Sequence, residues 1–349
     1  MIPARAVWLA LAAAALFGAS TPLAKVLVGE MPPVLLAGLL YLGSGLGLMM
    51  VFAVQRLRGD ATAGIDRPGR PWLAAAIVFG GVVAPVALVA GLRQTTGAAA
   101  ALLLNLEGLF TAGLAWFVFK ENFDRRIAAG MALILAGGIV LIWPAQGAPW
   151  SWPAGALLVA AASLCWAIDN NLTQRVSGGD PILIAGLKGL GAGLVNVTLA
   201  QVMASGWPEA RHIGGAMVVG LLGYGVSLVF FIVALRGLGT ARTGAYFSLA
   251  PFIGAGVSIL MLREPVTLQL GIAAALMGAG VWLHLTERHE HDHTHEPLVH
   301  SHAPGHDEHH QHAHDAGVPV EDPHTHTHVH ASLTHRHPHY PDLHHRHRH

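Results

Sequence analysis

Residues 33–46 read PVLLAGLLYLGSGL, and residues 181–194 read PILIAGLKGLGAGL. Aligned without gaps, the two stretches are identical at nine of fourteen positions. A second match follows at nearly the same spacing, and it pairs Arg93 with Arg236, Leu106 with Leu249, and Glu121 with Glu264. Matches that recur at one spacing indicate two copies of one structural unit, each about 145 residues long.

Apolar runs of about 17 to 24 residues fill the first 288 residues, and a helix of that length crosses about 30 Å of hydrocarbon. The expected spans are 7–28, 33–54, 72–92, 96–118, 127–143, 154–173, 181–204, 213–235, 241–262 and 267–285. Only 11% of all residues are Asp, Glu, Lys or Arg, whereas about a quarter are charged in soluble domains. The sequence therefore predicts an all-α integral membrane protein with ten transmembrane helices.

Each copy contains five of these spans. Because five is odd, the second copy enters the bilayer from the opposite side, so the copies form two inverted five-helix repeats. We assign the first repeat to residues 1–146 and the second to residues 147–288. Inverted repeats are common in secondary transporters, which bind their substrate near the middle of the membrane, between the repeats.

The distribution of Lys and Arg predicts the orientation in the membrane. If the N-terminus is cytoplasmic, twelve of these residues fall in cytoplasmic segments of the first 288 residues, and only Arg93, Arg211 and Arg263 fall outside. Positive residues are enriched on the cytoplasmic side of membrane proteins. We therefore expect a multi-pass protein of the cell (inner) membrane with both termini in the cytoplasm.

Three motifs carry a resemblance to a known family: LFGASTPLAKVLV at 16–28, RQTTGAAAALLLNLEGLFTAGLAWFVFKENF at 93–123, and its counterpart RGLGTARTGAYFSLAPFIGAGVSILMLREPVTLQ at 236–269. The chain resembles the EamA-type branch of the drug/metabolite transporter (DMT) superfamily over residues 7–285. The resemblance implies a ten-helix fold and the export or import of small solutes. The sequence departs from the family at Gly108, where Pro is usual, and at Leu40, where Arg is frequent.

Few ionisable groups lie inside the predicted spans. A charge at the bilayer centre costs about 2.5 to 3.5 kcal/mol, so each needs a partner or a wet cavity. We expect Asp169 and Lys188 to form a buried ion pair, because both lie at a similar depth on adjoining helices. The candidate residues for substrate binding or proton coupling are Glu107, Asn105, Asp169, Asn170, Lys188 and Thr21.

Glu107 lies about eleven residues into a span of roughly 23, near the middle of the bilayer, and no Lys or Arg is expected at its depth. An isolated carboxyl group in hydrocarbon is favoured in its neutral form. Glu107 is therefore expected to exchange a proton as a cavity opens alternately to each side, or to bind a cationic group of the cargo. The alternative is a permanently protonated side chain bonded to Asn170 or Thr21.

Residues 289–349 differ from the rest of the chain. They hold 22 of the 24 histidines, and residues 293–314 match residues 328–349 at a spacing of 35. Low hydrophobicity and many prolines predict a disordered tail. Imidazole is a ligand for Zn, Ni, Co and Cu. The expected metal ligands are His291, His293, His295, His300, His302, His309, His310, His324, His326, His328, His330, His335 and His337.

The sequence favours a secondary-active exporter of small organic metabolites, such as amino acids or drugs, with a metal-binding cytoplasmic tail and no required cofactor. In one alternative, divalent Ni, Co or Zn is itself the cargo, although the predicted spans contain no cluster of His. An integral-membrane enzyme is disfavoured, because Cys165 has no His in its own helix. The expected partners are a small solute, the lipid bilayer and divalent ions, but not nucleic acid. The oligomeric state stays open.

Overall fold

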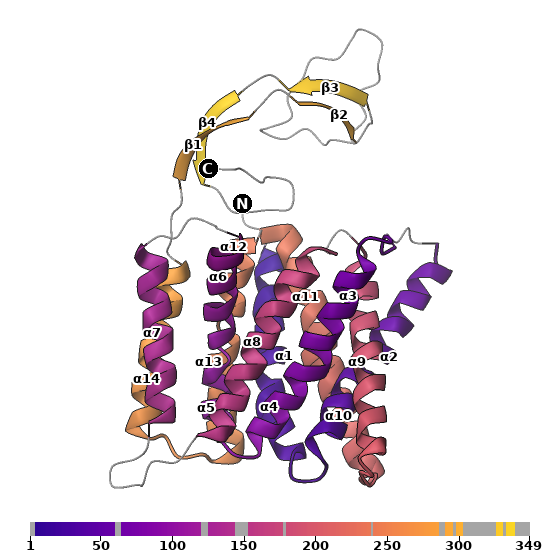
Figure 1. Cartoon of the computed structure of the whole chain (residues 1–349), viewed down its shortest axis with the longest axis vertical. Coiled ribbons are helices and arrows are strands. Elements are labelled where there is room, and N and C mark those ends of the chain that lie inside the picture. Colours follow the sequence, from indigo (N-terminus) through magenta and orange to yellow (C-terminus); the bar gives the residue numbers. More distant parts are fainter. Residues whose placement is uncertain are drawn as a thin grey trace. The chain divides into compact units, whose positions relative to one another are not determined.

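The computed structural model describes residues 4–59, 64–119, 125–143, 153–176, 179–238, 240–285, 290–295, 298–302, 326–330 and 333–338 of the 349. The chain divides into two units, Met1–Glu287 and Arg288–His349. The first unit is a bundle of helices and contains both sequence repeats, and we call it the body (Figure 1). The second unit is the tail.

The regular secondary structure in the described part of each repeat is helical. In the first repeat they are α1 (Ala4–Leu27), α2 (Pro33–Leu57), α3 (Arg70–Ala76), the π-helix η1 (Ile77–Val83), α4 (Ala84–Leu92), α5 (Gly97–Leu103), α6 (Leu106–Phe119) and α7 (Arg125–Ile142). In the second repeat they are α8 (Ala154–Gln174), α9 (Pro181–Val202), α10 (Ala210–Gly220), the π-helix η2 (Leu221–Val226), α11 (Ser227–Leu238), α12 (Thr240–Phe247), α13 (Ala250–Leu262) and α14 (Leu268–Leu285).

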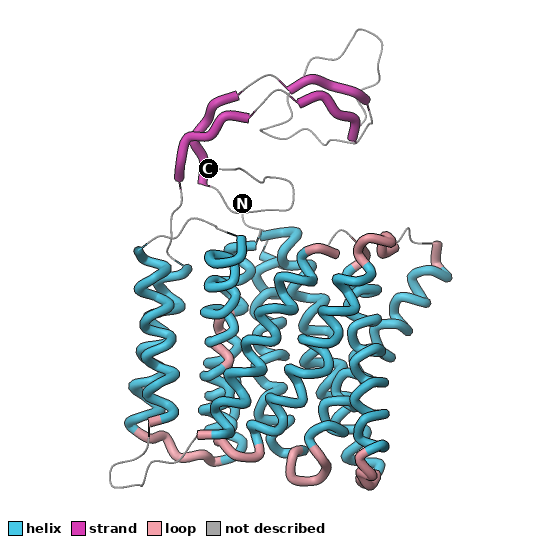
Figure 2. Tube along the Cα trace, viewed as in Figure 1, coloured by secondary structure: helices cyan, strands magenta, loops and turns pink. Residues whose placement is uncertain are grey.

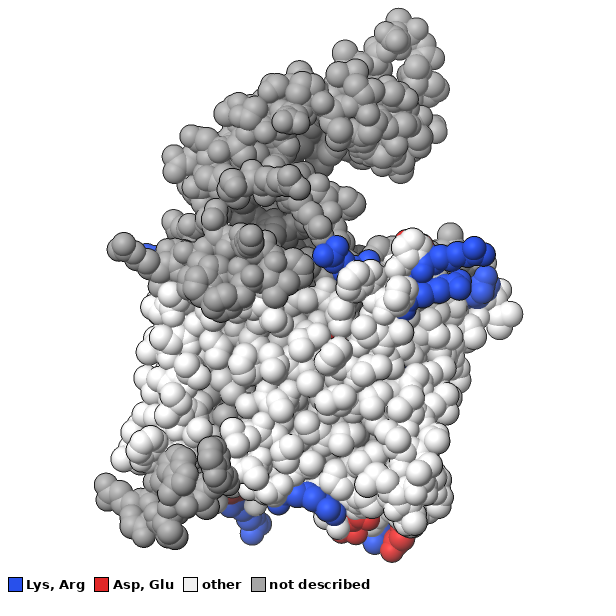
Figure 3. All heavy atoms as spheres, in the orientation of Figure 1, with Lys and Arg blue, Asp and Glu red and all other residues white. Residues whose placement is uncertain are grey.

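The described helices confirm the predicted membrane fold. Six helical segments are long and apolar enough to cross a membrane, and four shorter apolar helices lie among them. The loops lie mainly at the two ends of the body (Figure 2). On the face shown in Figure 3, Lys, Arg, Asp and Glu gather at these ends, and the wide band between them is almost uncharged. This pattern fits a body that exposes its apolar middle to lipid.

α1 begins and α14 ends on the same side of the body, which we call the terminal side; the opposite side is the far side (Figure 1). The equivalent helices α2 and α9 pack against each other. A Cβ atom on Gly45 would lie 2.3 Å from the backbone nitrogen of Leu190, and one on Gly189 would lie 2.5 Å from that of Gly45. Only glycine permits this approach, so these glycines serve helix packing.

Four spans depart from a regular α-helix, in two equivalent pairs. The third and eighth spans contain η1 and η2, and the fourth and ninth break at 104–105 and 248–249. At the first break, Asn105 Nδ2 donates to the carbonyl oxygen of Leu102 at 2.9 Å, a local bond that competes with helix continuation. At the second break, Pro251 follows and has no N–H to donate.

The tail contains four described strands, in segments where the sequence predicted no regular structure. They are β1 (Glu290–His295), β2 (Leu298–His302), β3 (His326–His330) and β4 (Leu333–Pro338). β1 pairs with β4 and β2 pairs with β3, both antiparallel. The prediction considered only how little apolar surface the tail can bury. Pairing also satisfies backbone N–H and C=O groups, and Thr and Val favour strands.

The two tail sheets are related by the internal repeat. A shift of 35 residues carries β1 onto β3 and β2 onto β4, so each sheet joins one strand from each copy. In the first sheet, His291 is the Cα partner of His337 and His293 that of His335. In the second, the equivalent pairs are His302 with His326 and His300 with His328. The register therefore aligns histidine with histidine at four places.

Candidate functional site

Glu107 lies in the first turn of α6, immediately after the break in the fourth span. Its Oε1 atom accepts a hydrogen bond from Nδ2 of Asn170 on α8, with a donor–acceptor distance of 2.8 Å. Asn170 is exposed and Glu107 is half-buried, and a Cβ on neighbouring Gly108 would meet nothing within 4 Å. The pair therefore borders open space, and it joins a helix of the first repeat to a helix of the second.

The predicted ion pair is present one residue away from Asn170. Lys188 Nζ donates to both carboxylate oxygens of Asp169, at 2.7 and 2.8 Å, and to the hydroxyl oxygen of Thr173 at 3.0 Å. The Thr173 hydroxyl in turn donates to Asp169 Oδ1 at 2.9 Å. The side chains of Asp169 and Lys188 are only 8% and 12% exposed. Burial combined with several hydrogen bonds is the arrangement that an intramembrane charge pair requires.

Two other candidate residues do not join this cluster through hydrogen bonds. Asn105 is buried, and its Nδ2 contacts the Leu102 carbonyl and the sulfur of Met277, the latter at 3.9 Å. Thr21 is also buried, in α1, at 2% exposure. The carboxylate of Glu107 bonds to Asn170, the first of the two partners that the sequence suggested. Through its bond to the Leu102 carbonyl, Asn105 shapes the helix break beside Glu107.

An aromatic cluster adjoins the site, and no local sequence pattern predicts it, because its members come from separate helices. Trp166 lies one helical turn before Asn170 on α8. Its ring centroid is 6.4 Å from that of Phe17, which is 5.9 Å from Tyr224 and 5.4 Å from Phe247. The first two contacts are edge-to-face, the geometry that aromatic pairs prefer.

The π-helix η1 supports the ion pair. The carbonyl oxygen of Gly80 accepts hydrogen bonds from the Tyr41 hydroxyl at 2.7 Å and from Trp166 Nε1 at 3.0 Å. In a π-helix, the N–H five residues later donates to such a carbonyl. That residue is Pro85, which has no N–H, so the Gly80 carbonyl has no π-helical donor. A Cβ on Gly80 would lie 1.9 Å from Asp169 Oδ2, so the ion pair packs directly on this glycine.

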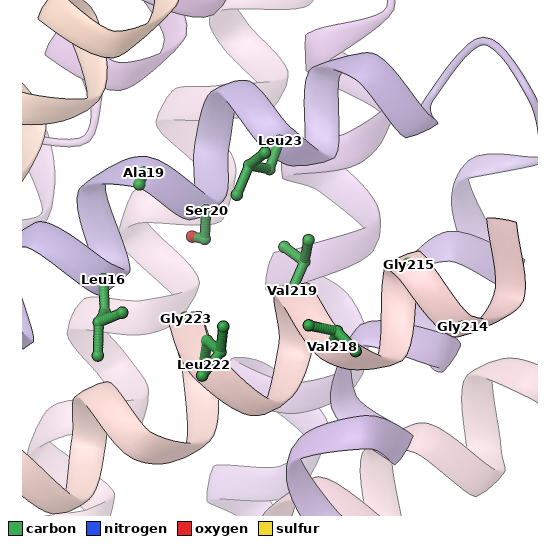
Figure 4. A pocket seen from close by; sticks show the side chains of 10 residues that line it. All are labelled: Leu16, Ala19, Ser20, Leu23, Gly214, Gly215, Val218, Val219, Leu222 and Gly223. Carbon is green, nitrogen blue, oxygen red and sulfur yellow. The ribbon is translucent and has the colours of Figure 1, made fainter. Parts of the chain in front are cut away.

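A separate apolar groove of about 430 Å³ lies between α1 and α10–η2 (Figure 4). It is lined by Leu16, Ala19, Ser20, Leu23, Gly214, Gly215, Val218, Val219, Leu222 and Gly223. Leu23, Val218 and Leu222 are exposed, as expected of side chains that face lipid tails. Glu107 and Asp169 do not line this groove, so it is distinct from the candidate site.

Of the predicted metal ligands in the tail, ten lie in the four strands. The other three, His309, His310 and His324, lie outside the described residues. For the ten, the structure gives the backbone register described above. Metal binding by the tail therefore stays a prediction.

Comparison with known proteins identifies the body. The EamA-like transporter family matches the chain twice, over residues 4–143 and 153–286. An uncharacterized transporter of Methanothermobacter thermautotrophicus is 28% identical over 282 residues, which are 76% of this chain and 82% of that protein. A probable amino-acid metabolite efflux pump of Salmonella typhimurium is 26% identical over 299 residues, covering 80% of this chain and 94% of the pump.

A solved crystal structure shows the same fold, with a TM-score of 0.60 and 21% sequence identity. The match covers 81% of this chain and 96% of that chain. The family matches and the transporter relatives point to transport rather than to an enzyme activity. The chain belongs to the EamA-like transporter family and is a multi-pass membrane transporter.

Proposed function

We propose that the protein is a secondary-active transporter that exports small organic metabolites and uses Glu107 to couple export to proton movement. The observation that carries this proposal is the Glu107–Asn170 pair, which borders open space where the fourth span is interrupted. Transporters built from inverted repeats place their sites at interrupted helices between the repeats. Here α6 belongs to the first repeat and α8 to the second.

The surroundings of Glu107 suit both protonation states. The first turn of α6 favours a carboxylate, because helix N-termini carry partial positive charge, and Asn170 donates a hydrogen bond to it. A closed, dry site favours the neutral acid instead. A carboxyl group that alternates between a wet and a dry setting takes up a proton on one side and releases it on the other.

The neighbouring side chains suggest the kind of cargo. Phe17, Trp166 and Tyr224 pack edge to face beside the site, and aromatic rings attract apolar or cationic groups when a cavity opens onto them. Asn170 and Glu107 offer a polar end. An amino acid or a related amine has both parts, and the relative from Salmonella typhimurium is described as a probable amino-acid metabolite efflux pump.

The cargo can be tested with proteoliposomes preloaded with single solutes from a panel of amino acids, aromatic amines and the chlorides of Ni, Co and Zn. We expect a proton gradient to drive at least one organic solute against its own concentration gradient. Transport of the metal ions alone would favour the alternative in which a metal is the cargo. Liposomes without protein give the leak rate of each solute.

We further propose that both termini are cytoplasmic, which the excess of Lys and Arg on the terminal side supports. Protease added outside intact spheroplasts should leave a C-terminal epitope placed after His349 uncut. The same protease should remove the epitope from inverted vesicles. Cleavage in intact spheroplasts would contradict this orientation.

The tail is proposed to bind divalent first-row metals through its histidines. Calorimetric titration of Ni or Zn should show binding to the intact protein that is lost when the chain is truncated after Arg288. Affinity should fall as pH drops through about 6.5, because protonated imidazole has no lone pair for a metal. Equal binding by the intact and truncated proteins would remove the tail from the proposal.

A composition-matched variant sharpens this test. Exchanging His335 and Arg336 keeps the number of histidines but removes His335 from its register partner His293. If metal binding depends on histidines that are partners in the strand register, the exchange should weaken the affinity by more than the loss of one of the thirteen predicted ligands would. If only composition matters, the exchange should leave the affinity unchanged.

A further inference from the structure

The turn between α4 and α5 lies on the far side of the body (Figure 1). The carboxylate of Glu264, in the segment between α13 and α14, accepts hydrogen bonds from the backbone N–H of Gly97 at 2.7 Å and of Ala98 at 2.8 Å. The Thr96 hydroxyl accepts from the N–H of Ala99 at 3.1 Å. The first three N–H groups of α5 are thus satisfied, two of them by a residue of the other repeat.

The same turn is held from its other end by α1. Lys25 Nζ donates to the carbonyl oxygen of Leu92, the last residue of α4, and to that of Thr95 at 2.8 Å. Arg93 Nε donates to the carbonyl oxygen of Val28 at 3.4 Å. These bonds connect elements within the first repeat. Of the described residues that hydrogen-bond to this turn, only Glu264 belongs to the second repeat.

The backbone that presents Glu264 is strained. Arg263, the residue that follows α13, has φ 53° and ψ 38°, a left-handed conformation that non-glycine residues rarely adopt. Such conformations persist where the surrounding contacts hold them, and they concentrate at functional sites. At the same place α5 and α13 approach closely, since a Cβ on Gly97 would lie 2.7 Å from the Ser258 hydroxyl oxygen.

We propose that the Glu264 carboxylate, bound to the start of α5, is the closed far-side gate of the transporter. The contact links the two repeats at the far side, whereas open space borders Glu107 further along the fourth span. α5 runs directly from this contact to the break that precedes Glu107. Release of Glu264 frees α5 to move relative to α13, and this opens the far side. The inference rests on the alternating-access transport proposed above.

The test measures from which side the site is reached, and it needs no substrate. The protein carries Cys165→Ala, which removes the only cysteine, and Gly108→Cys as a reporter, since a side chain there meets open space. Reconstituted vesicles of known orientation are labelled with a membrane-impermeant thiol reagent from either side. Labelling is compared between this parent, Glu264→Gln and Thr96→Ala. Thr96→Ala is the matched control, because it removes a cap from the same helix end without touching the link between repeats.

We expect the parent to label from the terminal side only. Glu264→Gln should raise far-side labelling about tenfold. The variant loses one or two hydrogen bonds that exist only in the state closed at the far side, and this shifts the population toward the open state. Thr96→Ala should stay within about twofold of the parent. Glu264→Asp replaces the Gln variant if the latter fails to elute as a folded monodisperse species, and the same increase is expected. Unchanged far-side labelling, or an equal rise in Thr96→Ala, would overturn the proposal, whatever Glu107 does in transport.

Discussion

Glu107→Gln should abolish proton-driven transport while leaving the protein folded. Glutamine keeps the shape of the side chain, and its carbonyl oxygen can still accept the hydrogen bond from Asn170. It cannot gain or lose a proton, so export should fall to the rate of liposomes without protein. The measurement is uphill movement of the identified solute under an imposed pH gradient.

The matched control is Glu30→Gln, the same chemical change at a carboxylate whose side chain is 54% exposed outside the candidate site. It should transport at the parent rate. Binding of the solute to Glu107→Gln, measured without a gradient, separates loss of coupling from loss of binding. A Glu107→Gln variant with unchanged rate and pH dependence would show that Glu107 is structural.

Breaking the Asp169–Lys188 pair on one side should be the most destabilising change in the body. Asp169→Asn or Lys188→Leu should each cost about 3 to 5 kcal/mol of unfolding free energy, because the remaining charge is stranded in a buried site. The double variant should lose clearly less than the sum, since it strands no charge. The measurement is a double-mutant cycle on denaturant unfolding in detergent.

The chain offers an internal comparison for this cycle. Arg211 and Glu209 also form an ion pair, with an N–O distance of 2.8 Å, but their side chains are 73% and 68% exposed. The corresponding cycle there should give a coupling below about 1 kcal/mol. If the losses at Asp169 and Lys188 were strictly additive, the two charges would not interact in the folded protein.

Much of the fold follows from periodicity and repetition in the sequence. The spans and their duplication were predictable, because an apolar run long enough to cross the bilayer forms a helix in lipid. The ion pair was predictable, because a charge buried in the membrane requires a partner at the same depth. Asp169 and Lys188 could be paired since both lie within a few residues of one connection. The sequence allowed either Asn170 or Thr21 as the hydrogen-bond partner of Glu107, and their similar depth in the membrane did not distinguish them.

Other features depend on contacts that no local pattern encodes. The bond from Tyr41 to the Gly80 carbonyl spans 39 residues, and the bond from Glu264 to Gly97 spans 167. The π-helix η1 and the broken spans arise where Pro85, Asn105 and Pro251 remove or divert single hydrogen bonds inside otherwise apolar helices. Apolar composition predicts which residues cross the membrane, but it does not show where a single backbone N–H donor is missing from the helix.

The most direct test of the account is proton movement coupled to solute movement in the unmodified protein. Proteoliposomes that contain a pH-sensitive dye, with no gradient imposed at the start, are exposed to a concentration step of the transported solute. Coupled exchange through Glu107 predicts that the solute flux moves protons across the membrane in the opposite direction, and that this proton flux disappears in Glu107→Gln. Solute flux with no accompanying proton flux in the unmodified protein would contradict the account.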